Sequence, residues 1–153
     1  MVRLAMAAAA ALALAALGAG PAGAQALPSN SDLQVVRIDP DAVAPGGQTV
    51  VHAFVANDGP ATTASPFTLE VEVPAGFTLL PPTFPAGCTT TPLLVSCTFG
   101  PGLAQGRTAT ALVPVEAGAS VPPGTVTQGH VRVISADDRH PGNNTTPFTL
   151  RVS

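Results

Sequence analysis

Residues 67–73, FTLEVEV, decide the fold class, because apolar and polar side chains alternate strictly along them. A period of two indicates a β-strand with one buried face and one wet face. We therefore expect Leu69 and Val71 to point into a core. Glu70 and Glu72 then point into water, which argues against a catalytic carboxylate pair on this strand.

Similar short runs rich in Val, Thr, Leu and Phe lie on both sides of this segment. Pro and Gly interrupt them at intervals of roughly eight to twelve residues, and no sustained helical periodicity follows the N-terminal segment. The expected strands are 33–38, 48–57, 67–73, 77–80, 93–99, 107–115, 125–135 and 145–152. This pattern predicts an all-β protein, an antiparallel β-sandwich of seven or eight strands.

The longest predicted strand has two candidate inner faces. Val51, Ala53 and Val55 share one face, and His52 and Phe54 lie on the other. An isolated large hydrophobic residue usually finds burial, so we expect Phe54 to point inward. If it is instead exposed, His52 and Phe54 mark an interaction patch.

The N-terminus reads as a secretory signal. Arg3 precedes an unbroken apolar run over residues 4–17, and small residues follow at Ala22–Ala24. The apolar run rises about 21 Å as a helix, short of a ~30 Å hydrocarbon core. The rival interpretation is an uncleaved N-terminal anchor. We expect a signal peptide at 1–24, a linker at 25–30 and one domain at 31–153.

A cleaved signal peptide implies that the protein is secreted, either extracellular or in the cell envelope. We expect no transmembrane segment after signal cleavage. The cleaved chain has no Lys, Trp or Tyr, and its five arginines face nine acidic residues. A net charge of −4 without a basic patch argues against nucleic acid and anionic membranes as partners. The lack of Trp and Tyr removes the usual stacking platform for sugars and bases.

Two cysteines remain in the expected domain. Cys88 and Cys97 are nine positions apart, which in an exported chain predicts one disulfide. A redox or metal pair is the alternative. It is disfavoured because the spacing is not C-x-x-C and no His lies between the two residues.

Four segments, in this order, resemble a known family. They are SDLQV at 31–35 running into DAVAPGG at 41–47, the strand at 50–55 closing on NDGP at 57–60, VPAGF at 73–77, and DRHPGNNT at 138–145. In these segments the chain resembles the family catalogued as "domain of unknown function 11", a module of bacterial surface and secreted proteins. The resemblance implies an immunoglobulin-like sandwich, an extracellular or envelope location, and a structural or adhesive role without catalysis.

Catalytic motifs are not apparent. No serine lies in a G-x-S-x-G elbow and no glycine-rich loop opens a helix, so we expect neither an enzyme nor a cofactor. The histidines, His52, His130 and His140, are too dispersed to predict a metal site. Residues 136–144 hold one cluster of oxygen ligands, at Asp137, Asp138, Asn143 and Asn144. These are Ca²⁺ candidates, although their spacing is not that of an EF-hand and a polar turn is the alternative.

The leading hypothesis is a secreted or envelope-associated, non-catalytic structural or interaction module. It would act through contact with an unknown protein partner, using an edge strand or the loops at one end of the sandwich. The alternative is an extracellular ligand-binding module, for a glycan or Ca²⁺, that uses the 136–144 loop.

Overall fold

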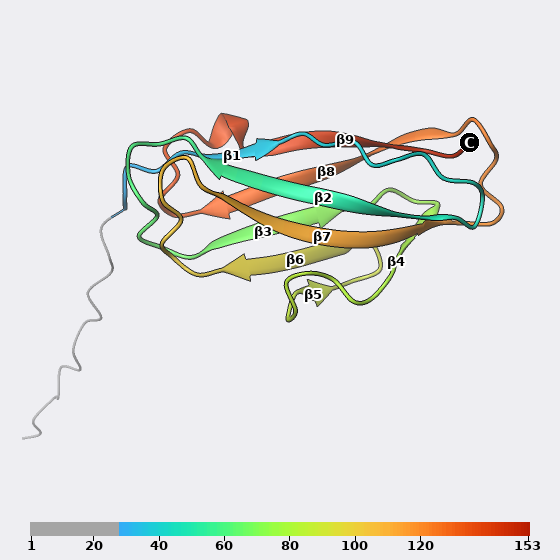
Figure 1. The fold of residues 1–153 in the computed structure, drawn as a ribbon, viewed down its shortest axis with the longest axis horizontal. Helices are drawn as coiled ribbons and strands as arrows, with labels where there is room; N and C mark the ends of the chain where they lie inside the picture. Colours follow the sequence, from blue (N-terminus) through green and yellow to red (C-terminus); the bar gives the residue numbers. More distant parts are fainter. Residues whose placement is uncertain (1–27) are drawn as a thin grey trace, which may run out of the picture.

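Two antiparallel sheets stack face to face in the computed structural model, which describes residues 28–153 (Figure 1). This confirms the predicted immunoglobulin-like β-sandwich. The signal peptide, its cleavage site and residues 25–27 of the expected linker lie outside the described residues, so those expectations stay predictions.

Nine strands and one 3₁₀ turn make up the described part of the chain. The first sheet has the order β1–β2–β7–β4, and the second has the order β5–β6–β3–β8–β9. The bounds are β1 Leu33–Val36, β2 Gln48–Asn57, β3 Phe67–Glu72, β4 Phe77–Leu79, β5 Thr89–Thr90, β6 Leu94–Phe99, β7 Thr108–Ala117, β8 Val126–Ser135, η1 Pro141–Asn143 and β9 Thr145–Arg151. The eight predicted strands are present. The ninth, β5, replaces an expected loop because Thr89 and Thr90 pair with β6.

The core lies between the two sheets and follows the alternation seen in the sequence. Leu69 and Val71 of β3 are fully buried, while Glu70 and Glu72 point outward as predicted. β3 is the central strand of its sheet, with β6 on one side and β8 on the other. Both neighbouring strands place buried residues opposite Leu69, namely Cys97 of β6 and Val133 of β8. Phe148 of β9 is the largest fully buried side chain.

The inward orientation expected for Phe54 is wrong. Val51, Ala53 and Val55 are fully buried, whereas Phe54 is half-buried on the outer face of β2. The reason is register, because the strands beside β2 place buried Val35 opposite Val55 and buried Val113 opposite Val51. A complete inward row of small apolar side chains, in register with buried neighbours, therefore outweighs the preference of one aromatic ring for burial.

The two long sides of the sandwich differ. On one long side β1 runs beside β9 (Figure 1), and hydrogen bonds from side chains join the two sheets there. Asp39 Oδ1 accepts a hydrogen bond from Thr149 N at 2.8 Å, and Thr146 Oγ1 donates one to Val35 O at 3.3 Å. We call this side the seam. On the opposite side the edge strands are β4 and β5.

Candidate functional site

The outer face of the first sheet carries the predicted patch. Register places Val36 of β1 opposite Phe54, and His52 opposite Leu112 of β7. Leu112 also pairs with Phe84 through an isolated bridge, so Phe84 extends this face beyond β7. Because directly opposite residues share a face, these five side chains lie together, and we call them the outer patch.

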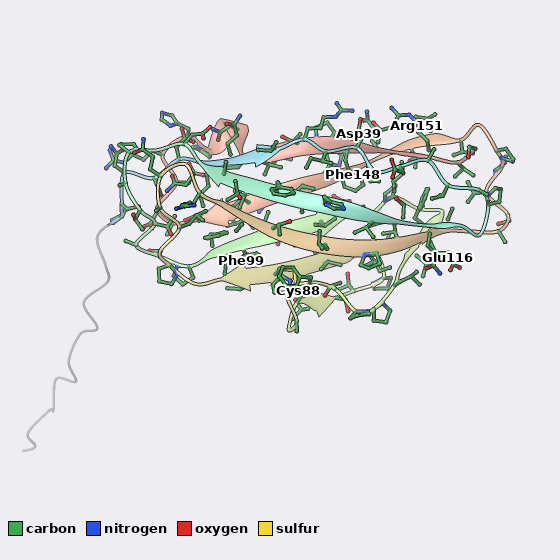
Figure 2. The ribbon with its side chains drawn as sticks, viewed as in Figure 1. Asp39, Cys88, Phe99, Glu116, Phe148 and Arg151 are labelled. Carbon is green, nitrogen blue, oxygen red and sulfur yellow. A yellow bond between two sulfur atoms is a disulfide. The ribbon has the colours of Figure 1, made fainter. Side chains whose placement is uncertain are left out.

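The outer patch is apolar and exposed. Val36 is 44% exposed and Phe84 is 55% exposed, and His52 is its one titratable member. Asp39 and Asp41 line a shallow hollow together with His52 at the border of the patch. Glu116 lies farther away, at the end of β7, where its carboxylate accepts a hydrogen bond from Gln48 (Figure 2). The outer face of the second sheet is different, since it carries Glu70 and Arg132 with a closest N–O distance of 3.7 Å.

At one end of the sandwich, the buried Asp137 anchors two other segments. Its Oδ2 accepts hydrogen bonds from the backbone N–H groups of Ala64 and Ser65, both at 2.6 Å, and its Oδ1 accepts one from Ser29 at 3.3 Å. Burial works to raise the pKa of Asp137, but these donors outweigh it and hold the pKa below the usual value. Both oxygens of this Ca²⁺ candidate are therefore occupied by the protein.

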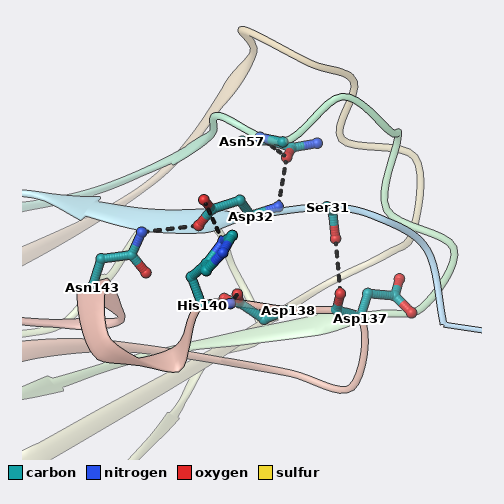
Figure 3. Close-up of polar contacts among 8 residues, drawn as sticks. Ser31, Asp32, Asn57, Asp137, Asp138, His140 and Asn143 are labelled. Atoms are coloured by element: carbon teal, nitrogen blue, oxygen red, sulfur yellow. Dashed lines mark hydrogen bonds and ion pairs between the residues drawn. The ribbon is translucent and has the colours of Figure 1, made fainter.

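Asp32 lies at the centre of a second polar cluster at this end (Figure 3). Its Oδ2 is 2.9 Å from His140 Nδ1, and its Oδ1 accepts a hydrogen bond from Asn143 Nδ2 at 2.9 Å. Its backbone N–H donates to Asn57 Oδ1, and the Asn57 amide donates to the carbonyl of Leu103. The cluster thus ties the start of β1 to the 136–144 loop and to the turn after β2.

Three oxygens of the predicted loop are buried without a hydrogen-bond partner in the described part of the chain. They are Asp138 Oδ2, Asn143 Oδ1 and Asn144 Oδ1. All three belong to residues that the sequence nominated for Ca²⁺. Within residues 28–153, however, no three His, Cys, Asp or Glu side chains are arranged to hold a metal ion. His52 and His130 lie on the outer faces of different sheets.

The predicted disulfide is present between Cys88 and Cys97. Cys97 is a buried residue of β6, and Cys88 precedes β5 at the lower edge in Figure 2. Beside this bond lies a cleft of about 750 Å³, bounded by residues 77–83, 86–88 and 90–92. None of these residues is ionisable.

Two features of this region are not apparent from the sequence. Phe84 lies in the Pro-rich segment between two predicted strands, where alternation gives no signal. Asp39 lies in a predicted turn, yet its carboxylate accepts a hydrogen bond from a residue 110 positions away. Hydrogen bonding from Arg37 lowers the pKa of Asp39, although burial opposes this.

Comparison with known proteins supports the fold. No family model matches the chain, and no curated protein matches it. The third cohesin of ScaC from Acetivibrio cellulolyticus, solved in complex with the ScaB dockerin, is 12% identical with a TM-score of 0.53, over 78% of this chain and 98% of that one. A type III cohesin module of the cell-surface anchoring scaffoldin ScaE from Ruminococcus flavefaciens is 12% identical with a TM-score of 0.52, over 82% and 89%. CaCohA2 of Clostridium acetobutylicum, in a complex with CaDoc0917, is 14% identical with a TM-score of 0.51, over 80% and 99%.

These similarities concern architecture. Over the described residues, no helix is long and apolar enough to cross a membrane. The chain shares with these cohesin modules an all-β sandwich fold.

Proposed function

We propose that this chain is a secreted or cell-envelope-associated, non-catalytic module that acts by contact with a protein partner. The resemblance of its motifs to the "domain of unknown function 11" family supports this role. The cohesin modules of similar fold provide a parallel, since two of them were solved in complexes with another protein.

The outer patch is the observation that carries the proposal. Large apolar groups exposed together on a monomer mark interaction surfaces more often than chance placement does. Burying Val36 and Phe84 contributes about 25 cal/mol per Å² of apolar surface removed from water. Because the patch holds no Asp, Glu, Lys or Arg, binding there requires no desolvation of a fixed charge.

The polar clusters at the end of the sandwich are better explained as structural than as catalytic. Asp137 is saturated by backbone donors, and the partner of Asp32 is His140, whose side chain is 70% exposed to solvent. A catalytic site needs titratable groups that converge where a substrate can sit.

Site-specific photo-crosslinking in the native host tests the proposal. p-Benzoylphenylalanine at Phe54 places the photoreactive group in the outer patch, and the same residue at Glu70 is the matched control on the opposite face. We expect a defined covalent adduct with one protein from position 54 and none from position 70. No adduct from either position, or the same adducts from both, would overturn the proposal.

A second candidate function, Ca²⁺ binding, is favoured by the three unpartnered oxygens of the 136–144 loop. Buried polar atoms without partners usually contact water or an ion, and Ca²⁺ prefers carboxylate and amide oxygens. An ion that binds only the folded state raises the Tm. We therefore expect Ca²⁺, but not Mg²⁺, to raise the Tm of the wild type.

Asp138→Asn is the matched variant for this test. It keeps the oxygen that accepts the hydrogen bond from His140 N at 2.8 Å, but it removes the charge. The shift in Tm should disappear in this variant. An unchanged Tm in the wild type with Ca²⁺, or an equal rise in both proteins, would contradict Ca²⁺ binding by this loop.

A further inference from the structure

The cleft beside the disulfide lies on the open side of the sandwich. It is bounded by β4 of the first sheet and by β5 of the second, which are the edge strands of their sheets (Figure 1). Its volume of about 750 Å³ is within the range of known ligand sites. Apolar and Thr side chains bound it, and no charge is among them.

β4 leaves backbone groups unpaired along this cleft. Leu80 N donates to Pro114 O at 2.9 Å, and Gly118 N donates to Gly76 O at 2.8 Å. These bonds mark alternate residues of β4 as the ones that pair with β7. Leu79 lies between them in the alternation, so its N–H and C=O point away from β7 and toward the open side.

β5, the edge strand of the second sheet, also leaves backbone groups unpaired beside the cleft. Thr91 N donates to Leu94 O at 2.8 Å, which fixes the alternation of the β5–β6 ladder. The N–H and C=O of Thr90 therefore point away from β6. The Cys88–Cys97 bond holds the chain entering β5 against β6, so the unpaired groups have a fixed position.

Proteins usually cover or charge the open edges of their sheets. The seam of this sandwich is covered, because Asp39 and Thr146 satisfy backbone groups across it. The β4 edge has no such cover and no charged residue. Pro81 and Pro82 follow it directly and limit the available edge to a few residues, which hinders extensive pairing with other chains.

We infer that this cleft binds a short, extended, uncharged segment of a partner protein, which adds as a strand along β4. An extended peptide supplies the donors and acceptors that Leu79 and Thr90 lack, whereas a hydrocarbon ligand does not. The uncharged lining selects small apolar and hydroxyl side chains on the segment, since a buried charge would have no counterion there. The inference rests on the proposed function in that the occupant is a protein, but it uses a surface other than the outer patch.

The test uses a defined probe, a nine-residue peptide of alternating Val and Thr with both ends blocked. It is titrated into the ¹⁵N-labelled protein and followed by NMR. We expect saturable shifts of the Leu79 and Thr90 amides. The same peptide N-methylated at every second residue keeps the side chains but loses the backbone donors on one edge. It should bind about tenfold more weakly, as expected for the loss of one to two hydrogen bonds.

A pair of protein variants isolates the donor on β4. Leu79→Pro removes the outward N–H without breaking a bond to β7, and Leu79→Ala loses the same side chain but keeps the N–H. The peptide should bind Leu79→Ala more tightly than Leu79→Pro by about tenfold. The N-methyl comparison on the wild type needs no variant, so it stays decisive if Leu79→Pro unfolds.

Three results would overturn the inference. Equal binding of both peptides would make the cleft an apolar pocket without strand addition. Shifts that appear with protein concentration alone would make the occupant a second copy of the chain. No shift with either peptide would leave the cleft without this function. Crosslinking from Phe54 is independent of all three, so the inference and the proposed function fail separately.

Discussion

Replacing Asp137 with asparagine should destabilise the sandwich strongly. The wild-type carboxylate accepts three backbone N–H groups, and Asp137 is 1% exposed. Asparagine has one acceptor oxygen, so its NH₂ group must lie against either the Ala64–Ser65 pair or Ser29. One or two donors lose their partner, and each costs about 1–3 kcal/mol when buried. The free energy of unfolding should therefore fall by about 2–4 kcal/mol.

Urea unfolding at pH 7 measures this change, with Asp41→Asn as the control because Asp41 is exposed. For a domain of this size, the loss corresponds to a midpoint lower by roughly 1–2 M. A difference of less than about 0.5 kcal/mol between wild type and Asp137→Asn would refute the argument, since it would mean that the three contacts contribute nothing net.

The contribution of the Asp137 carboxylate to stability should also depend on pH, in a direction that its pKa fixes. The folded-state pKa of Asp137 is below its usual 3.8, so its charged form stabilises the fold above the unfolded pKa. That contribution is lost as the pH falls through the folded-state value. The gap in stability between wild type and Asp137→Asn should be largest above about pH 5 and should narrow below about pH 4. A gap that widens on acidification would contradict this.

Three further predictions concern packing, the disulfide and export. Gly129→Ala places a Cβ against the Phe148 ring and should cost about 1–3 kcal/mol in urea unfolding, whereas Gly142→Ala meets no atom within 4 Å and should change little. Replacing both Cys88 and Cys97 with serine should cost about 2.7 kcal/mol, and reductant should then no longer lower the Tm. Intact mass of the exported protein should show loss of the 24-residue leader and a deficit of two hydrogens that reduction removes; a retained leader would favour the membrane anchor.

Alternation predicted most of the fold. It identified β3 and the inward orientation of Leu69 and Val71, because strand period and burial are local properties. It missed β5, because two consecutive threonines show no alternation of apolar and polar residues. It also predicted the wrong orientation for Phe54. The orientation of Phe54 depends on the register of β2 against β1 and β7, which no local pattern encodes.

The candidate site was less predictable for the same reason. The sequence correctly paired Cys88 with Cys97 and placed His52 and Phe54 on one face. It did not bring Phe84 to that face, since a single bridge to Leu112 does so. Nor could turn chemistry show that the carboxylate of Asp137 would be filled by donors from segments more than 70 residues earlier.

The seam between β1 and β9 also has a consequence for motion. Opening the sandwich on that side must break the bond from Thr149 N to Asp39. On the β4–β5 side the described residues form no hydrogen bond between strands of different sheets, and the two sheets are linked there by the chain itself, between Phe84 at Leu112 and the Cys88–Cys97 bond. Spontaneous fluctuations should therefore separate the two sheets first at the β4 and β5 edges, while the seam between β1 and β9 stays closed. Among hydrogen-bonded amides, exchange with solvent would then be slow at Thr149 and faster at Leu80, whose N–H donates to Pro114 O on the β4 side, a gradient across the width of the sandwich rather than along its strands.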